Sequence, residues 1–205
     1  MDSKLVILGN GVHSKVVYEL AVLLGHKIFG FIDIYGNDRT SLGNLDDLND
    51  ISKTHKDLSY VIATGNNLKR KEISEMYPNL NYVKLIAPSA YISPSAKIGT
   101  GSVVLHKAVI NTNAVIGNHT LINTGVIVEH DNSIGNFTHL SPGVTLGGTV
   151  KIGDLTHLGL NSTVRNNVSI GNSIVIGMGS AVINNIGEPG TYVGVPAKEI
   201  KEGEN

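Results

Sequence analysis

The sequence of 205 residues contains no cysteine. It therefore has no disulfide bond, no thiol that could act as a nucleophile, and no metal site with cysteine ligands. It also lacks an apolar run near the ~20 residues that a transmembrane helix needs. The first residues lead directly into a strand-like stretch at residues 4–8 and do not resemble a signal peptide. We therefore expect a cytoplasmic protein with no membrane-inserted segment.

An excess of charge of either sign is absent as well. The chain carries 16 lysines and arginines against 17 aspartates and glutamates, which gives a formal net charge of −1. Proteins bind nucleic acid and anionic membranes through a field of positive charge, which this composition does not provide. Neither is expected as a partner.

The sequence does contain a six-residue repeat. An aliphatic residue stands at every sixth position from residue 86 to residue 182, and a small or β-branched residue fills the position four further on in most units. This spacing fits neither the helical period of about 3.6 residues nor the strand period of about 2 taken alone, so it indicates a coiled unit that repeats by position. The aliphatic column consists of Ile86, Ile92, Ile98, Val104, Ile110, Ile116, Ile122, Val128, Ile134, Leu140, Leu146, Ile152, Leu158, Val164, Ile170, Ile176 and Val182.

The repeat predicts a β-solenoid over residues 86–205, closed by a C-terminal cap. The aliphatic column would line the inside of a narrow prism, and glycine and asparagine would turn the chain at its corners. Such a prism has flat faces and open strand edges, which repeat proteins cover by capping or by association. We therefore expect an oligomer.

The first 85 residues follow a different pattern, in which strands and helices alternate. Strands are predicted at residues 4–8, 27–32, 60–63 and 82–85, and helices at residues 14–24, 45–53 and 68–77. This order predicts a small Rossmann-like α/β domain with a parallel sheet over residues 1–85.

Parallel sheets bind ligands at the carboxyl ends of their strands, where residues 9–13, 33–35 and 65–67 should lie together. The first loop is similar to a dinucleotide fingerprint with Ser14 in place of the last glycine, and Asp33 could hold a ribose hydroxyl. Three alternatives remain open: glycines that serve turn geometry alone, an aspartate that is merely a solvated strand end, and an NAD-binding domain.

The repeat units resemble the hexapeptide signature of left-handed β-helix acyltransferases. The resemblance implies three hexapeptides in each coil, a left-handed coil, and between five and six coils. The loop at residues 9–13, the Gly-Asn-Asn at residues 65–67 and the array directly behind them make the whole chain similar to a bacterial family. These are the nucleotide-sugar acyltransferases related to sialic acid O-acetyltransferase and UDP-4-amino-sugar N-acetyltransferase.

In that family the small domain holds the nucleotide of the sugar substrate. Where these enzymes often have a second acid after the aspartate of the second strand, this chain has Ile34. The resemblance assigns substrate binding to Asn10, Gly11, Val12, His13, Asp33, Gly65 and Asn66.

The segment Glu-His-Asp at residues 129–131 interrupts the hexapeptide pattern directly after an inward valine. Acetyl transfer from a thioester needs a base for the proton of the nucleophile, and histidine suits this task with an unperturbed pKa of about 6.5. In the family that the chain resembles, the histidine of this segment is the base and the following carboxylate raises its basicity. These roles carry to His130 and Asp131, for which a surface histidine on a solenoid edge is the alternative.

The same resemblance implies acetyl-coenzyme A as the co-substrate and no metal. It places Asn123 in the active site and His139 near the thioester. His157 follows His139 by one coil of three units, so the two should stack on one edge. The resemblance assigns cofactor binding to Asn123, His139, Gly148, Leu160, Met178 and Lys198.

Together these features predict an N-acetyltransferase that acts on a nucleotide-linked 4-amino-4,6-dideoxy sugar by direct transfer in a ternary complex. The resemblance further implies a homotrimer with active sites between subunits. An O-acetyltransferase acting on a sialic acid hydroxyl is the main alternative. A zinc-dependent carbonic anhydrase of the same solenoid and a non-catalytic sensor are two others. The nucleotide, whether UDP, dTDP or GDP, stays open.

Overall fold

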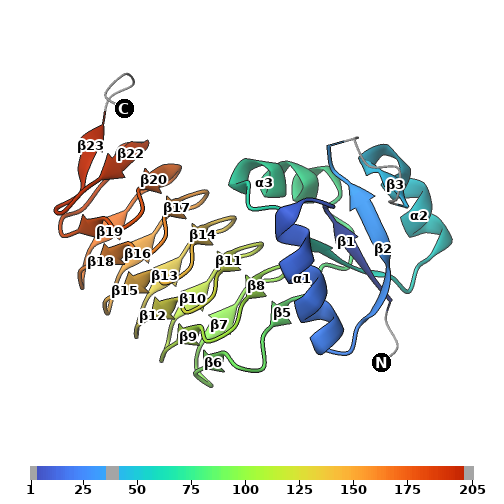
Figure 1. Ribbon diagram of the computed structural model, residues 1–205, viewed down its shortest axis with the longest axis horizontal. Helices are drawn as coiled ribbons and strands as arrows, with labels where there is room; N and C mark the ends of the chain where they lie inside the picture. Colours follow the sequence, from blue (N-terminus) through green and yellow to red (C-terminus); the bar gives the residue numbers. More distant parts are fainter. Residues whose placement is uncertain (1–3, 36–41, 201–205) are drawn as a thin grey trace. The chain divides into compact units, whose positions relative to one another are not determined.

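The computed structural model describes residues 4–35 and 42–200. By its internal contacts the chain divides into two compact units, Met1–Leu85 and Ile86–Asn205. The first is an α/β unit and the second is a β-solenoid (Figure 1). No helix of the described residues is long and apolar enough to cross a bilayer.

The α/β unit has a four-stranded parallel sheet with the strand order β3-β2-β1-β4. The strands are β1 (Lys4–Leu8), β2 (Lys27–Asp33), β3 (Gly43–Asn44) and β4 (Ser59–Ile62). The helices are α1 (Val12–Leu23), the 3-10 helix η1 (Leu45–Asp47), α2 (Leu48–Thr54) and α3 (Asn67–Met76).

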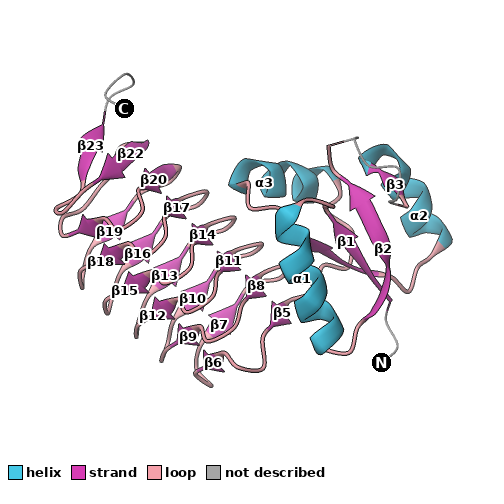
Figure 2. Cartoon of the chain, in the orientation of Figure 1, coloured by secondary structure: helices cyan, strands magenta, loops and turns pink. Residues whose placement is uncertain are grey.

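Helices cover both faces of this sheet because β1, one of its two inner strands, is apolar and buried from Leu5 to Leu8. Val6 and Leu8 share a core with residues of α2 and α3, including Leu48 and Ile73. Neighbouring residues of a strand face opposite sides, so Ile7 and its partner Phe31 face the other way, where Tyr18 of α1 contacts the Phe31 ring. The sheet therefore lies between helices, as Figure 2 shows in colour by element type.

The strand predicted at residues 82–85 is wrong. Tyr82 makes a single parallel bridge with Tyr60. Two residues after Leu85, the amide of Ala87 donates to the carbonyl of Val104, 2.9 Å away. The backbone therefore pairs within the solenoid at this point and does not continue to pair along β4. The fourth strand of the sheet is instead the two-residue β3, which the sequence analysis missed.

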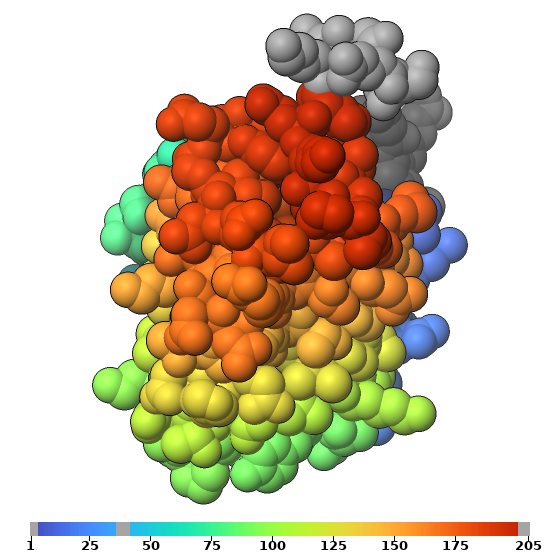
Figure 3. Space-filling model, turned by 90° about the vertical axis from the view of Figure 1, so that its left-hand side faces the viewer, coloured from blue at the N-terminus to red at the C-terminus, as the bar shows by residue number. Residues whose placement is uncertain are grey.

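The solenoid consists of three sheets of short strands that pair in parallel, except for the antiparallel pair of the last two strands, β22 (Gly190–Val193) and β23 (Lys198–Ile200). Before that pair, consecutive strands pass from one sheet to the next, in agreement with the three hexapeptides per coil that the resemblance implied. Strands one coil apart pair in register, as Ile116 does with Ile134 and Ile134 with Ile152. The coils stack in chain order for about six turns, from green to red in Figure 3.

The eight-stranded sheet contains β5 (Leu85–Ile86), β8 (Val103–Val104), β11 (Leu121–Ile122), β14 (His139–Leu140), β17 (His157–Leu158), β20 (Ile174–Ile176), β22 (Gly190–Val193) and β23 (Lys198–Ile200). The six-stranded sheet contains β6 (Tyr91–Ile92), β9 (Val109–Ile110), β12 (Ile127–Val128), β15 (Thr145–Leu146), β18 (Thr163–Val164) and β21 (Ala181–Val182). The five-stranded sheet contains β7 (Lys97–Ile98), β10 (Val115–Ile116), β13 (Ser133–Ile134), β16 (Lys151–Ile152) and β19 (Ser169–Ile170).

The aliphatic column forms the solenoid core, and most of its members from Val104 onward are almost completely buried. The corners follow the prediction only in part. Asn113 and Asn161 have positive φ as expected, but so do bulky residues such as Phe137 and Leu155. At these bulky corners a backbone bond to the previous coil holds the strained conformation, as in the bond from the Phe137 amide to the Asn118 carbonyl.

Candidate active site

The His130 segment lies at one corner of the solenoid, between β12 of the six-stranded sheet and β13 of the five-stranded sheet. The neighbouring coils hold its backbone from both sides. The Asp131 amide donates to the Thr112 carbonyl, and the His130 carbonyl accepts from the Thr149 amide, each over 2.9 Å. Because Val128 is completely buried just before it, the segment starts from a fixed point.

His130 and Asp131 form a hydrogen-bonded pair at this corner. Nδ1 of His130 lies 2.8 Å from Oδ2 of Asp131, and both side chains are about half exposed. The other carboxylate oxygen of Asp131 accepts from Nδ2 of Asn113 at 3.1 Å. The hydrogen bonds from His130 and then Asn113 lower the pKa of Asp131. An ionised Asp131 favours a proton on Nδ1, which leaves Nε2 of the ring able to accept one.

Gly148, one coil further on, forms the floor beneath this ring. A Cβ atom built on Gly148 would lie 2.6 Å from Nε2 of His130, which is closer than real Cβ contacts come. Only glycine leaves this space for the imidazole. The structure therefore brings together three predicted site residues: His130, Asp131 and Gly148.

A second group of predicted residues gathers on the eight-stranded sheet. The rings of His139 and His157 stack with centroids 4.7 Å apart and an interplanar angle of 11°, which confirms the predicted stacking. Nδ2 of Asn123 lies 3.4 Å from Nε2 of His139. Ser141, which the sequence analysis missed, lies 2.9 Å from Nε2 of His157 through its Oγ. Imidazole, amide and hydroxyl groups thus form a polar cluster on this sheet.

These two groups lie on different sides of the prism. His130 stands at the corner between the six- and five-stranded sheets, and in a three-sided prism this corner is opposite the eight-stranded sheet. His139 belongs to that eight-stranded sheet, and since its neighbour Leu140 points into the core, His139 points outward. A single chain therefore does not bring His130 and His139 into one site.

The remaining residues predicted for the cofactor lie away from Gly148. Leu160 and Met178 follow β17 and β20 of the eight-stranded sheet at the same corner of consecutive coils, and 48% and 76% of their surfaces are exposed. Lys198 begins β23, which pairs antiparallel with β22. These residues belong to the side of His139 and to the C-terminal cap.

In the α/β unit, the three predicted loops meet at the carboxyl end of the sheet. The Gly9 amide donates to the Ile32 carbonyl at 2.8 Å, and a Cβ atom on Gly9 would lie 2.9 Å from the Ala63 carbonyl oxygen. Since φ of Gly9 is +129°, glycine is required at this crossing. The hydroxyl groups of Tyr35 and Thr64 lie 3.3 Å apart and join the second loop to the third. The predicted proximity of these loops is thus observed.

Four predicted substrate residues lie at the start of α1. Gly11 is the N-cap in an extended conformation, and the helix begins at Val12, two residues before the predicted start. Val12 is 84% exposed, Asn10 and His13 are half-buried, and all four lie before or within the first turn of the helix. They therefore present a helix N-terminus to the loops at the end of the sheet.

Two other predicted residues have structural duties in this region. Oδ1 of the buried Asp33 accepts from the Tyr35 amide at 2.8 Å, which forms a tight turn. Oδ1 of Asn66 accepts from the Lys69 amide at 2.9 Å and caps α3. Gly65, just before this cap, is exposed.

Arg70 is a charged residue of this region that the sequence analysis missed. It is 97% buried, and its guanidinium donates to the Thr64 carbonyl at 2.9 Å and to Oδ1 of Asn67 at 2.8 Å. Burial lowers its pKa to about 10. Burial and the nearby Arg70 charge lower the pKa of His13 to about 4, so this imidazole is neutral at pH 7. Arg70 thus places a buried positive charge at this end of the sheet.

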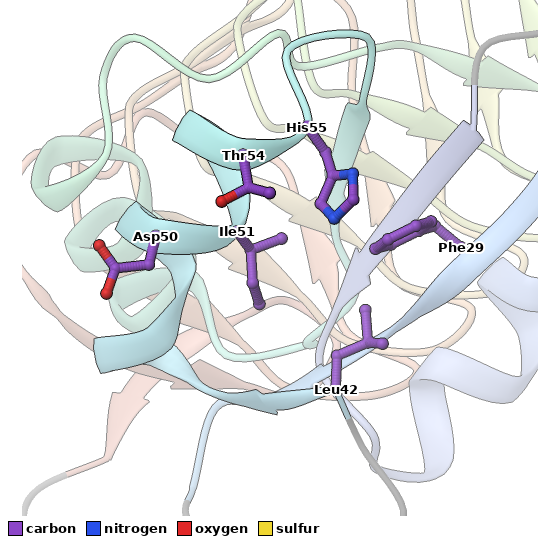
Figure 4. Close-up of a pocket in the computed structure, with 6 residues that line it drawn as sticks. All are labelled: Phe29, Leu42, Asp50, Ile51, Thr54 and His55. Atoms are coloured by element: carbon purple, nitrogen blue, oxygen red, sulfur yellow. The ribbon is translucent and has the colours of Figure 1, made fainter.

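A cavity of about 320 Å³ in the same unit contains none of the predicted residues. Figure 4 shows it between β2 and α2, where the Phe29 and His55 rings lie with centroids 4.9 Å apart. Its lining consists of Phe29, Leu42, Asp50, Ile51, Thr54 and His55.

Comparison with known proteins finds a matching family for the α/β unit and a curated relative of the chain. Residues 4–77 match the PglD N-terminal domain family. UDP-N-acetylbacillosamine N-acetyltransferase of Bacillus subtilis (strain 168) is 36% identical over 110 residues, or 48% of this chain. The matched region covers 50% of that protein, so the chain spans about half the length of this curated relative.

Solved structures match over nearly the whole chain. The acetyltransferase domain of PglB from Neisseria gonorrhoeae FA1090 is 33% identical with a TM-score of 0.88, covering 96% of this chain and 99% of that one. The same domain has been solved in complex with acetyl coenzyme A. PerB from Caulobacter crescentus, solved in complex with CoA and GDP-perosamine, is 30% identical with a TM-score of 0.92, covering 98% and 99% of the two chains.

Proposed function

The chain belongs to the PglD family of nucleotide-sugar N-acetyltransferases, and from this membership we propose that it transfers an acetyl group from acetyl-coenzyme A to a nucleotide-linked 4-amino-4,6-dideoxy sugar. Relatives with matching folds bind coenzyme A and a GDP-linked amino sugar, or are named for acetylation of a UDP-linked one. The observation that carries the proposal is the His130–Asp131 pair, with Nε2 of His130 above Gly148.

The proposed reaction is a direct transfer within a ternary complex. The amine nitrogen of the sugar attacks the thioester carbonyl carbon, and Nε2 of His130 takes a proton from that nitrogen. The new C–N bond forms, the C–S bond breaks, and the coenzyme A sulfur takes the proton from His130 as it leaves. Asp131 accepts from Nδ1 and stabilises the imidazolium that forms between the two proton transfers. No covalent enzyme intermediate is involved.

The nucleotide is assigned to the carboxyl end of the sheet in the α/β unit. The N-termini of α1 and α3 meet the loops there, and helix N-termini favour anions such as a diphosphate. The residues proposed to bind the sugar nucleotide are Asn10, Gly11, Val12, His13, Asp33, Gly65 and Asn66.

We assign coenzyme A to the eight-stranded sheet that carries His139 and to the corner that carries Leu160 and Met178. Gly148 would contact it from the corner that carries His130. Because His130 and His139 lie on different sides of one prism, a complete site needs a second copy of the chain. We therefore propose a homotrimer with one active site at each subunit interface. Exposed apolar side chains on the solenoid, such as Val175 and Ile183, support association. We also propose that the reaction takes place in the cytoplasm.

His130→Ala tests this function. We expect the variant to lower kcat by a factor of about 100 or more, because it removes the base, while calorimetry still detects coenzyme A and sugar-nucleotide binding. Thiol release should be followed with UDP-, dTDP- and GDP-linked 4-amino sugars and with hydroxyl acceptors such as free sialic acid. Near-normal turnover of the variant, or acetylation of hydroxyl acceptors alone, would reject the proposal.

The proposed trimer has its own test. Light scattering on the purified protein should give a mass three times that of the 21.7 kDa chain. Mixing His130→Ala with His139→Ala protein should restore activity, because mixed trimers contain interfaces with both histidines intact. A monomeric mass, or no recovery after mixing under conditions that exchange subunits, would contradict the shared site.

A further inference from the structure

Three asparagine side chains surround the Glu129–Asp131 segment, and two of them come from the preceding coil. Nδ2 of Asn111 donates to Oε2 of Glu129 at 3.1 Å. Nδ2 of Asn113 donates to Oδ1 of Asp131, also at 3.1 Å. Each asparagine stands directly beside its carboxylate in the stack of coils. Both carboxylates that flank His130 are thus held by amides of the coil before it.

The third asparagine, Asn132, acts on the backbone. It is 99% buried, and its Nδ2 donates to the carbonyls of Glu129 at 2.9 Å and Gly147 at 3.1 Å. Its Oδ1 accepts from the Val150 amide. These bonds join the residue before His130 to the residue before Gly148. One side chain therefore fixes both the start of the segment and the floor beneath the imidazole.

The solenoid itself does not require a polar residue at this position. The positions one coil before and after Asn132 hold Ala114 and Val150, and the next holds Val168, all of them buried in the apolar core. A buried amide among aliphatic neighbours carries a desolvation cost unless it makes hydrogen bonds. Asn132 makes three, and all of them act on the corner that carries His130.

The arrangement around Asp131 has a chemical consequence. With Oδ1 bound by Asn113 and Oδ2 facing Nδ1 of His130, neither carboxylate oxygen can turn away without losing a bond. A fixed acceptor beside Nδ1 selects the imidazole tautomer that carries its proton there. Nε2 then presents its lone pair above Gly148, where the proton of the acceptor must arrive.

We propose that Asn111, Asn113 and Asn132 are positioning residues that set the tautomer and the place of the His130 ring for acetyl transfer. This inference rests on the proposed function only for its effect on catalysis. Its effect on the imidazole exists in the protein without substrates. The two parts can therefore be tested separately.

Asn113→Gly is the most informative variant, because Asn113 has a φ of +59° and glycine adopts that conformation without strain. Asn167→Gly is its matched control, since Asn167 occupies the same corner three coils later with a φ of +61°. Nitrogen-15 NMR of the imidazoles should show His130 with its proton on Nδ1 in the wild type and in Asn167→Gly. In Asn113→Gly we expect a mixture of both tautomers.

Kinetics with acetyl-coenzyme A and the best sugar nucleotide of the panel supply the second readout. We expect Asn113→Gly to lower kcat about tenfold with KM changed less than about twofold, and Asn167→Gly to leave both within about twofold. In a double-mutant cycle with Asp131→Asn, the Asn113→Gly change should add almost nothing, because it acts through Asp131. Asn132→Val, which copies the next coils, should also lower kcat with little change in KM.

The outcomes separate the two hypotheses. If no nucleotide sugar is acetylated by the wild type, the proposed function fails, while the NMR experiment still tests the positioning role. A single tautomer in Asn113→Gly, equal effects of Asn113→Gly and Asn167→Gly, or full additivity with Asp131→Asn would overturn the positioning role. Should Asn113→Gly fold poorly, Asn132→Val supplies the second NMR test, because valine can form none of the three bonds of Asn132, and it should also give a mixture of tautomers.

Discussion

Nε2 of His130 would lie 2.6 Å from a Cβ atom on Gly148, although the two residues stand one full coil apart in the chain. The imidazole occupies the space that a side chain would fill in any other residue. The backbone of one coil thus forms the floor of a candidate site whose proposed base belongs to the coil before it.

Gly148→Ala should therefore impair catalysis more than folding. Gly148 does not have a positive φ, so alanine is compatible with its backbone, and the methyl group would push against an imidazole that is 58% exposed and can move. We expect kcat to fall about tenfold, equivalent to ~1.4 kcal/mol of transition-state stabilisation, as the ring leaves its position. The melting temperature should change by only a few degrees.

Gly187→Ala is the matched control for this prediction. A Cβ atom on Gly187 meets nothing within 4 Å, and its φ is not positive. The control should keep wild-type kcat and KM. Equal kcat in Gly148→Ala and wild type would mean that the ring position above Gly148 has no part in turnover.

Asn66→Asp should separate the two roles that Asn66 has in the α/β unit. An aspartate keeps the oxygen that caps α3 at the Lys69 amide, so the free energy of unfolding should stay within about 0.5 kcal/mol of wild type. The added negative charge should weaken binding of a nucleotide diphosphate about tenfold if the phosphates lie at this helix N-terminus. Calorimetric titration with the nucleotide measures this, and unchanged affinity would remove Asn66 from the binding site.

The depressed pKa of His13 predicts a pH-dependent stability. The folded state holds this pKa at about 4, whereas the ordinary value is 6.5. As the pH falls through this window, the unfolded chain gains a proton that the folded chain does not, so stability present at neutral pH is lost. Compared with His13→Gln, the wild type should lose on the order of 2 kcal/mol more between about pH 7 and about pH 4.5.

Urea unfolding at the two pH values measures this loss. His26→Gln, which changes a histidine in the turn after α1, is the control and should follow the wild type. An equal loss of unfolding free energy between the two pH values in wild type and His13→Gln would show that His13 takes up its proton in the folded state as readily as in the unfolded chain.

The buried column of the solenoid should dominate its stability. Leu140 is completely buried, and truncation of such a leucine costs about 2–5 kcal/mol because it leaves a cavity. Leu140→Ala should lower the urea midpoint clearly, whereas Val115→Ala, at a position 44% exposed, should change the free energy of unfolding by less than about 0.5 kcal/mol. Similar effects of the two variants would contradict a core built on the aliphatic column.

Some features of this protein follow from local spacing in the sequence, and others do not. The stacking of His139 on His157 followed from their spacing of 18 residues and from the three-hexapeptide coil that the resemblance implied, and it is observed. The prediction of a strand at residues 82–85 was wrong because the apolar residues of this segment fit either unit. Which unit they pair with depends on the backbone partners available, and only Tyr82 forms a bridge with the α/β sheet. Asn113 and Asp131 also stand one coil apart, so a search for polar pairs at that spacing would have found their bond.

The sequence by itself determined the solenoid, because the residues that must be buried in each coil recur at a fixed spacing of six residues. Its polar Glu-His-Asp segment at residues 129–131 also predicted His130 as the base, through the resemblance to a known family. Only the tertiary structure decided that His130 and His139 lie on different sides of one prism and that Arg70 is buried beside the loops proposed to bind the nucleotide. The direction of a side chain at a corner and the burial of a charge depend on neighbours far away in the chain, which no local period records.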